Sequence, residues 1–293
     1  MRTRREFTTA VVAAAAARGE PARCKALIID GRNNHDWRST SPVLKRLLEE
    51  TGLFRVEFAT APQASAQMES FLPAFGSSDL IVLNYSDFGN GGVWNEHAKF
   101  AFVEAVKGGT GVVVYHAASS AFADWEEFNR IVGLGGWGGR DERSGPHLYW
   151  EADAIVMDQS PAKAGHHGPR HPYAVVTRQP AHPIMAGLPP VWMHASDELY
   201  DTLRGPAEEL QVLATAWSDP AFAGTARHEP VLFTVRFGRG RIFHTTLGHD
   251  PEAMQCVGFI VTLQRGAEWA ATGRMTQPRP SDFPTERQVS LRP

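Results

Sequence analysis

The sequence predicts an α/β protein with a doubly wound, mostly parallel sheet and helices on both faces. Short continuous apolar runs are typical of strands covered on both sides, and such runs lie within residues 79–84 (DLIVLN) and 111–115 (GVVVY). Segments with helical spacing of apolar residues alternate with the runs, which is typical of βαβ units. The 293 residues are enough for one such domain or at most two.

The first half of the chain supplies most of these elements. A first strand is expected at 26–30, followed by a helix in which Val43, Leu44, Leu47 and Leu48 recur at helical spacing until Gly52 ends it. The further expected elements are strands at 54–58, 79–84 and 111–115 and a helix at 97–106.

After Gly133 the alternation becomes weaker. The expected elements there are strands at 210–214, 231–237 and 241–246, a tight turn at 236–241, and a helix at about 252–271. We expect the main domain to cover residues 25–273. The Pro-rich tail at 274–293 is expected to be extended or mobile.

Residues 1–24 resemble a twin-arginine export signal. Arg4 and Arg5 precede an apolar, Ala-rich run at 10–17. This run is too short to span a bilayer, which takes about 20 residues. A frayed Ala-rich helix is the alternative. The sequence therefore predicts an exported, periplasmic protein without a membrane span.

Composition narrows the classes of partner. The formal net charge of −3 gives no reason to expect nucleic acid or an anionic membrane as partner. Cys24 and Cys256 are the two cysteines, so there is no disulfide framework, although a single pair stays open.

Candidate catalytic residues follow the expected strands, because chemistry in open α/β sheets collects at the carboxyl ends of strands. His116 is the first residue after the run at 111–115, where a nucleophile-elbow enzyme would have Ser or Cys. This argues against a cysteine amidotransferase or peptidase. His249 follows Gly248, which permits a sharp turn. Glu198 lies in an apolar context, and burial there would raise its pKa toward that of a general acid.

Each of these residues has a structural alternative. His116 could be a core histidine, and Glu198 could form an ion pair with a surface arginine. His35 lies on the loop after the first strand, where it could be solvated while Asp36 caps the next helix. The residues expected to bind substrate are His35, Asp36, Asn84, Trp125, His147 and Tyr200. The histidines expected to be solvated or structural are His166, His167, His171, His182 and His194.

A divalent metal is a further option. Three histidines and a carboxylate suit catalytic Zn²⁺. The sequence has no HExxH-type spacing, so such a site would depend on distant loops coming together. The ligand set therefore stays unknown.

Several linked motifs carry a family resemblance. They are the His35 loop, YHAASSAFADWEEFNRIVG at 115–133, His147 after a Gly-rich stretch, HPIMAGLP before DELY at 197–200, and GRGRIFHTTLGHD at 238–250. Their order and spacing resemble the trehalose-utilisation (ThuA-like) family, over about residues 25–273. The resemblance implies a fold similar to flavodoxin and the class I glutamine amidotransferases. It also implies a role in the catabolism of disaccharides, including 3-keto derivatives.

Two hypotheses follow. The first is an enzyme acting on a disaccharide or 3-keto-glycoside, with His116 as base or metal ligand, Glu198 as acid and His249 as an orienting partner. The second is a non-catalytic carbohydrate-binding protein, which the eight tryptophans would suit equally well.

Overall fold

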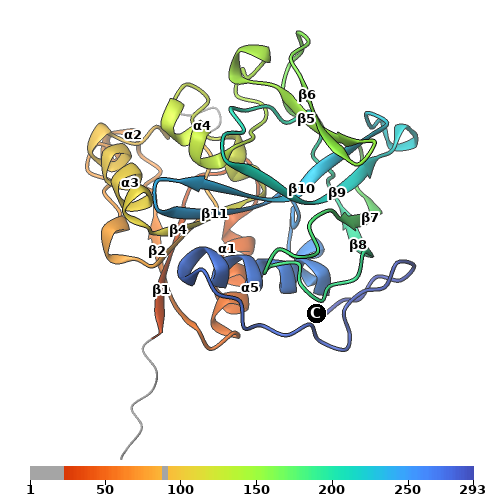
Figure 1. The fold of residues 1–293 in the computed structure, drawn as a ribbon. Coiled ribbons are helices and arrows are strands. Elements are labelled where there is room, and N and C mark those ends of the chain that lie inside the picture. The colour runs from red at the N-terminus through yellow and green to blue at the C-terminus, as the bar shows by residue number, and fades with distance from the viewer. Residues whose placement is uncertain (1–22, 88–91) are drawn as a thin grey trace, which may run out of the picture.

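The computed structural model describes residues 23–87 and 92–293 (Figure 1). Apart from its last two residues, the predicted export signal at 1–24 lies outside this part of the chain. Within the two described segments, no helix has the length and apolar character that crossing a membrane requires.

The centre of the molecule is one sheet with the strand order β2-β1-β3-β4-β11-β10-β9-β7-β8, to which β5 and β6 attach at β10. The strands are β1 Cys24–Asp30, β2 Phe54–Thr60, β3 Leu80–Leu83, β4 Gly111–Tyr115, β5 His147–Glu151, β6 Ala154–Asp158, β7 His171–Thr177, β8 Val191–Asp197, β9 Leu210–Ser218, β10 Arg227–Phe237 and β11 Gly240–Thr245. The α-helices are α1 Trp37–Glu49, α2 Ser65–Met68, α3 Glu96–Gly108, α4 Glu126–Val132 and α5 Val257–Thr272.

The sheet is mixed, so the expected predominance of parallel strands is not found. From β2 to β11 the neighbouring strands pair in parallel, as their helical crossovers require. From β11 to β8, and between β10, β5 and β6, all pairings are antiparallel. The reason is local, since the chain between β5 and β11 has no α-helix to carry a crossover.

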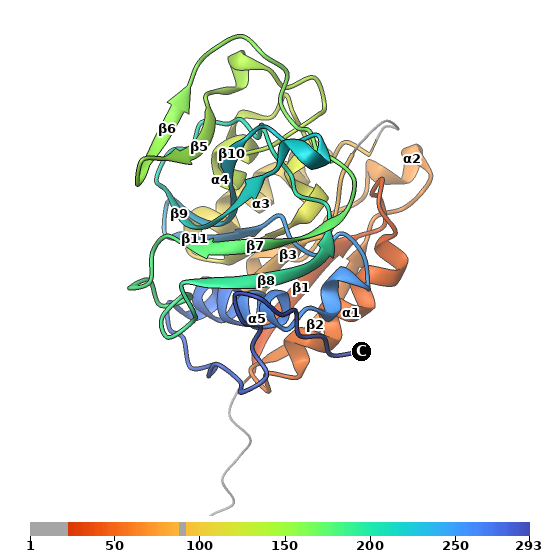
Figure 2. The same ribbon diagram turned by 90° about the vertical axis from the view of Figure 1, so that its right-hand side faces the viewer.

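Helices cover both faces of the sheet, as predicted. Helices α1 and α5 lie on one face and α3 and α4 on the other (Figures 1 and 2). Strand β4 shows why both faces need covering: Val113 and Tyr115 belong to the core under α1 and α5, whereas Val112 and Val114 belong to the core under α3 and α4.

The helix ends follow from single residues. The side chain of Asn95 accepts a hydrogen bond from the Ala98 amide and so caps α3. Gly109, with φ of 114°, ends this helix in the left-handed region that glycine tolerates. The helix expected at 252–271 begins later, because a 3₁₀ turn occupies Ala253–Gln255 and α5 starts at Val257.

The C-terminal tail, expected to be extended or mobile, forms no helix in its described residues 274–293 and packs against the domain. Phe283 is 8% exposed, and its ring lies 5.6 Å from the ring of Trp192. The Met193 amide donates to the Thr285 carbonyl, and the Val257 amide donates to the Ser290 carbonyl. Apolar burial and backbone pairing thus outweigh the polar composition of the tail. Cys24 and Cys256 are both free thiols.

Tail docking predicts a stability effect. Phe283→Ala should lower the free energy of unfolding by about 3 kcal/mol, because it leaves a cavity beside Trp192. Leu291→Ala is the control in the same tail, since Leu291 is 52% exposed, and it should change this value by less than about 0.5 kcal/mol. Urea denaturation of both variants measures the difference. Equal, small effects would mean that the tail does not contribute to the core.

Candidate functional site

His116 ends β4 and begins the 3₁₀ turn His116–Ser120. Its φ of 45° is rare for a residue with a side chain and is common at functional sites. The residue is 1% exposed, and Nδ1 lies 2.5 Å from the Thr246 carbonyl oxygen. Because a carbonyl can only accept, Nδ1 carries the hydrogen, and Nε2 of the neutral ring keeps a free lone pair.

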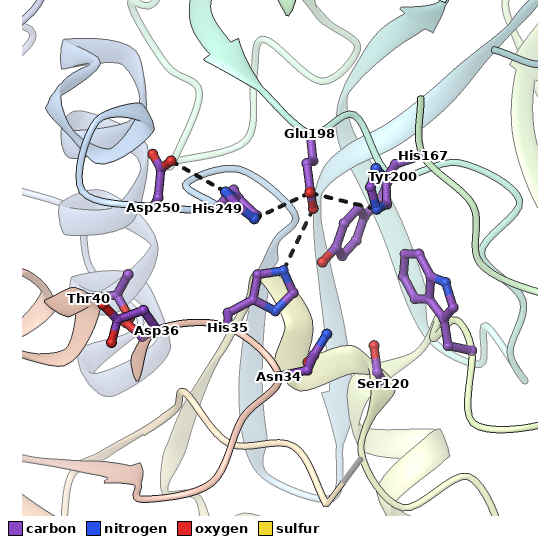
Figure 3. A pocket seen from close by; sticks show the side chains of 11 residues that line it. Asn34, His35, Asp36, Thr40, Ser120, His167, Glu198, Tyr200, His249 and Asp250 are labelled. Carbon is purple, nitrogen blue, oxygen red and sulfur yellow. Dashed lines mark hydrogen bonds and ion pairs between the residues drawn. The ribbon is translucent and has the colours of Figure 1, made fainter. Parts of the chain in front are cut away.

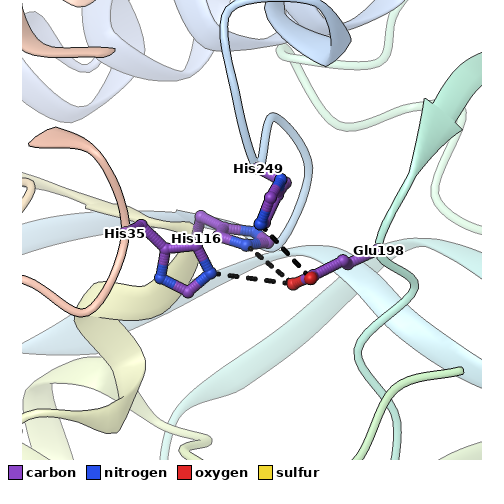
Figure 4. A group of neighbouring side chains, drawn as sticks. All are labelled: His35, His116, Glu198 and His249. Atoms are coloured by element: carbon purple, nitrogen blue, oxygen red, sulfur yellow. Dashed lines mark ion pairs between the residues drawn. The ribbon is translucent and has the colours of Figure 1, made fainter. Parts of the chain in front are cut away.

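Three further side chains meet His116 (Figure 4). His35 comes from the loop after β1, Glu198 follows β8, and His249 comes from the turn after β11. Glu198 Oε2 lies 3.7 Å from Nε2 of His35 and 3.6 Å from Nε2 of His116, and Oε1 lies 3.2 Å from Nε2 of His249. The ring centroid of His35 lies 4.9 Å from that of His116 and 4.8 Å from that of His249. We call these four side chains the His₃Glu cluster.

A fully buried carboxylate, Asp197, positions two members of the cluster. It accepts hydrogen bonds from the amides of Gly248 at 2.6 Å and His249 at 3.1 Å, and also from the Glu198 amide at 2.9 Å. His194 Nε2 lies 2.7 Å from the same carboxylate. The end of β8 is thereby tied to the turn after β11. Gly248 makes that turn feasible, with φ of 93° and a Phe259 ring carbon 2.6 Å from where a Cβ would stand.

The cluster lies at a pocket of about 470 Å³ (Figure 3). Tyr200 packs against His116, with ring centroids 4.3 Å apart, and Trp137 meets Tyr200 edge-on at 4.7 Å. The residues that line the pocket are Asn34, His35, Asp36, Thr40, Ser120, Trp137, His167, Glu198, Tyr200, His249 and Asp250.

The charges of the cluster differ from the prediction for Glu198. Burial alone would raise the pKa of this carboxyl, but the imidazoles of His116 and His35 outweigh it and hold the pKa well below its ordinary 4.5. The expected raised pKa of a general acid is therefore wrong, and Glu198 is ionised at neutral pH. Burial lowers the pKa of His116 below 6.5, although Glu198 acts in the opposite direction.

Three residues expected to bind substrate lie elsewhere. Asn84 is 1% exposed and donates to the hydroxyls of Thr40 and Ser41, so it holds the start of α1. Trp125 packs among aromatic rings 5.4–5.5 Å away. His147 is not a loop residue: it begins β5, is 4% exposed, and donates through Nε2 to Glu229 at 2.9 Å. Burial and internal partners take up the polar groups of Asn84 and His147, and the partly buried ring of Trp125 packs against other aromatic rings.

The other expected residues lie at the pocket. His35, Glu198, Tyr200 and His249 line it directly. Asp36 does so too, while its side chain caps α1 by accepting from the Ser39 amide. The suggested capping role of Asp36 is therefore present, but His35 is in contact with Glu198 and is not simply solvated.

Sequence reasoning missed several pocket residues, among them His167 and Trp137. His167 was expected to be solvated or structural, but its Nε2 lies 3.7 Å from Glu198 Oε1. The backbones of His166 and Asp201 pair with each other. This pairing brings the irregular segment at 160–171 against the segment that carries Tyr200. The Trp137 amide donates to the Ala164 carbonyl at 2.9 Å. Both contacts are long-range, and the sequence carries no local signal for them.

Comparisons with known proteins agree on one family. The sequence profile of the ThuA family, described as trehalose utilisation, matches residues 25–270. The structure is similar to that of a ThuA-like protein from Parabacteroides merdae ATCC 43184, with 48% identity, a TM-score of 0.89, and coverage of 92% of this chain and 98% of that one. A ThuA-like protein from Bacteroides uniformis ATCC 8492 shares the fold at 17% identity and a TM-score of 0.56, covering 89% of this chain and 96% of that one. No curated protein gives a significant match.

The buried His194–Asp197 pair predicts a pH dependence of stability. Burial opposes the charge on the imidazole, but the Cys256 sulfur and the Asp197 carboxylate favour it and raise the pKa of His194 to about 10. A raised pKa stabilises the fold fully below the unfolded value of 6.5, and this contribution disappears as the pH rises toward 10. The difference in unfolding free energy between wild type and His194→Gln should therefore shrink from pH 6 to pH 10.

Urea denaturation at pH 6, 8 and 10 measures this difference. His97→Ala serves as the control, because His97 is an exposed histidine on α3. A gap between wild type and His194→Gln that stays constant with pH would contradict a charged His194.

Proposed function

The chain belongs to the trehalose-utilisation (ThuA) family, and on this basis we propose that it is an enzyme acting on a disaccharide or a 3-keto-glycoside. The family gives the chain a carbohydrate-related role. The finer proposal is supported chiefly by one observation: an ionised carboxylate and three imidazoles meet at one point of a polar pocket.

The pocket suits a sugar. Its volume of about 470 Å³ lies in the range of about 300–1,000 Å³ found for small-molecule sites. Asn34, Thr40, Ser120 and Asp250 offer hydrogen-bonding groups for hydroxyls. Trp137, which packs edge-on against the buried Tyr200, adds apolar ring surface on which the carbon skeleton of a sugar can rest.

The His₃Glu cluster suits chemistry at a keto-sugar. A ketone acidifies the neighbouring C–H, so elimination or isomerisation needs a group that accepts this proton, and hydrolysis needs an activated water. The lone pairs of Glu198 and of the imidazoles supply negative charge and basicity at one place. Because Glu198 is ionised, it can accept a proton or neutralise a positive charge, but it cannot donate a proton. This is the reverse of the role expected from the sequence.

Export of the protein to the periplasm remains part of this proposal. It is supported by Arg4 and Arg5 ahead of the Ala-rich run. The first described strand begins at Cys24, so cleavage shortly before this residue would leave the sheet intact.

Turnover of a keto-glycoside tests the proposed activity. With 3-keto-trehalose and related 3-keto-glycosides as substrates, Glu198→Gln should lower kcat by about 100-fold or more, since it removes the charge and keeps the shape. His97→Ala, on the exposed face of α3, should turn over like wild type. Sugar binding in calorimetry without product from the wild-type protein would instead favour a carbohydrate-binding protein.

Trp137 tests where the sugar binds. Trp137→Ala should weaken sugar binding in calorimetry by about tenfold, which corresponds to the loss of one stacked ring. Trp217→Ala is a matched control, because Trp217 is 44% exposed and does not line this pocket. Equal affinities for wild type and Trp137→Ala would place the sugar elsewhere.

A further inference from the structure

We propose that the His₃Glu cluster binds one divalent transition-metal ion, of which Zn²⁺ is the best probe. The inference deepens the proposed function by naming an ion in the same pocket, but the binding itself does not depend on which sugar is used. It stands on three observations: the spacing of the ligand atoms, the atoms left without partners, and the contacts on the far side of each imidazole.

The spacing of the four ligand atoms matches a common centre. All four lie within 4.8 Å of one another. The Glu198 oxygens lie 3.7, 3.6 and 3.2 Å from Nε2 of His35, His116 and His249. Ligands held at about 2.1 Å around Zn²⁺ are separated by about 3.4 Å in a tetrahedron. The two separations from Oε2, 3.7 and 3.6 Å, are too long for good hydrogen bonds and close to the edge length of such a tetrahedron, and the 3.2 Å separation brings the second carboxylate oxygen to the same centre.

The cluster leaves buried polar atoms unsatisfied. His116 Nε2 and Glu198 Oε2 are buried and have no hydrogen-bond partner in the part of the chain that the structure describes. His116 is 1% exposed, so its lone pair is also withdrawn from solvent. An unpaired buried polar atom destabilises the folded protein. Both atoms face the centre of the cluster, where a cation would satisfy them together (Figure 4).

The far nitrogen of each imidazole faces an oxygen. Nδ1 of His116 lies 2.5 Å from the Thr246 carbonyl oxygen, Nδ1 of His35 lies 3.4 Å from Asn33 Oδ1, and Nδ1 of His249 lies 3.5 Å from Asp250 Oδ2. Oxygens on Nδ1 favour the tautomer that leaves Nε2 unprotonated, and such partners are typical of metal-bound histidines. In this tautomer each of the three rings presents a lone pair to the same point, as a bound cation requires.

The donor set indicates which ions fit. Imidazole nitrogens favour Zn²⁺ and its transition-metal neighbours, whereas Mg²⁺ and Ca²⁺ prefer oxygen ligands throughout. Because His249 and Glu198 also line the pocket, the ion would be reachable from it. A bound ion there would polarise a sugar carbonyl or lower the pKa of a bound water.

Metal binding tests this inference without any substrate. Full-length protein is stripped with a chelator, dialysed against ZnCl₂, and its zinc content is measured together with the thermal shift. Wild type and His97→Ala should each retain one Zn²⁺ per chain and gain thermal stability from Zn²⁺ but not from Mg²⁺. Glu198→Gln and His35→Ala should bind Zn²⁺ at least about tenfold more weakly.

Using His35→Ala, whose residue lies on a loop, avoids the folding risk of truncating the buried His116. The inference is overturned if wild type retains none of Zn²⁺, Mn²⁺ or Ni²⁺, or if both variants bind Zn²⁺ as tightly as wild type. Turnover of a keto-glycoside by wild-type protein that retains none of these ions would overturn the metal site and leave the proposed function standing. Tight Zn²⁺ binding without turnover would do the reverse.

Discussion

The buried carboxylate of Asp197 is the constraint on which the site depends. It accepts from the amides of Glu198, Gly248 and His249 and contacts His194, so one side chain joins the end of β8 to the turn after β11. β8 lies at the far edge of the sheet from β1, whereas β11 lies in its middle. In the described sheet β8 and β11 are not paired with each other, so the Asp197 carboxylate links two strand ends that the backbone ladder leaves apart. The sheet brings the strand ends to one edge, and Asp197 fixes the positions of Glu198 and His249 there.

The parallel half of the fold could be predicted because its signals are local. The strands at 26–30, 80–83 and 111–115 contain continuous apolar runs, and the helices between them show their spacing within a few turns. The antiparallel half gave weaker signals. Strand β6 is largely exposed, and β7 and β8 contain His171, Pro172 and His194, so neither shows a plain apolar run. Their place in the sheet depends on pairing with distant strands, which a single sequence does not display.

The site shows the same division. His35, His116 and His249 could be proposed because each follows a recognisable strand and so reaches the same edge of the sheet. His167 and Trp137 could not, because backbone contacts between two irregular segments bring them to the pocket. Asn84, Trp125 and His147 were misassigned for the opposite reason. Their types suit sugar binding, but the polar groups of Asn84 and His147 are occupied by partners far apart in the chain, and Trp125 packs against neighbouring aromatic rings.

The central claim is that four side chains from four distant segments form one metal-binding reaction centre. Anomalous diffraction at the zinc absorption edge, on crystals of the protein grown with ZnCl₂, tests it most directly. We predict a single strong peak about 2 Å from Nε2 of His35, His116 and His249 and from a Glu198 oxygen. An ordered cluster with no peak at its centre, or zinc bound solely at surface histidines, would contradict it.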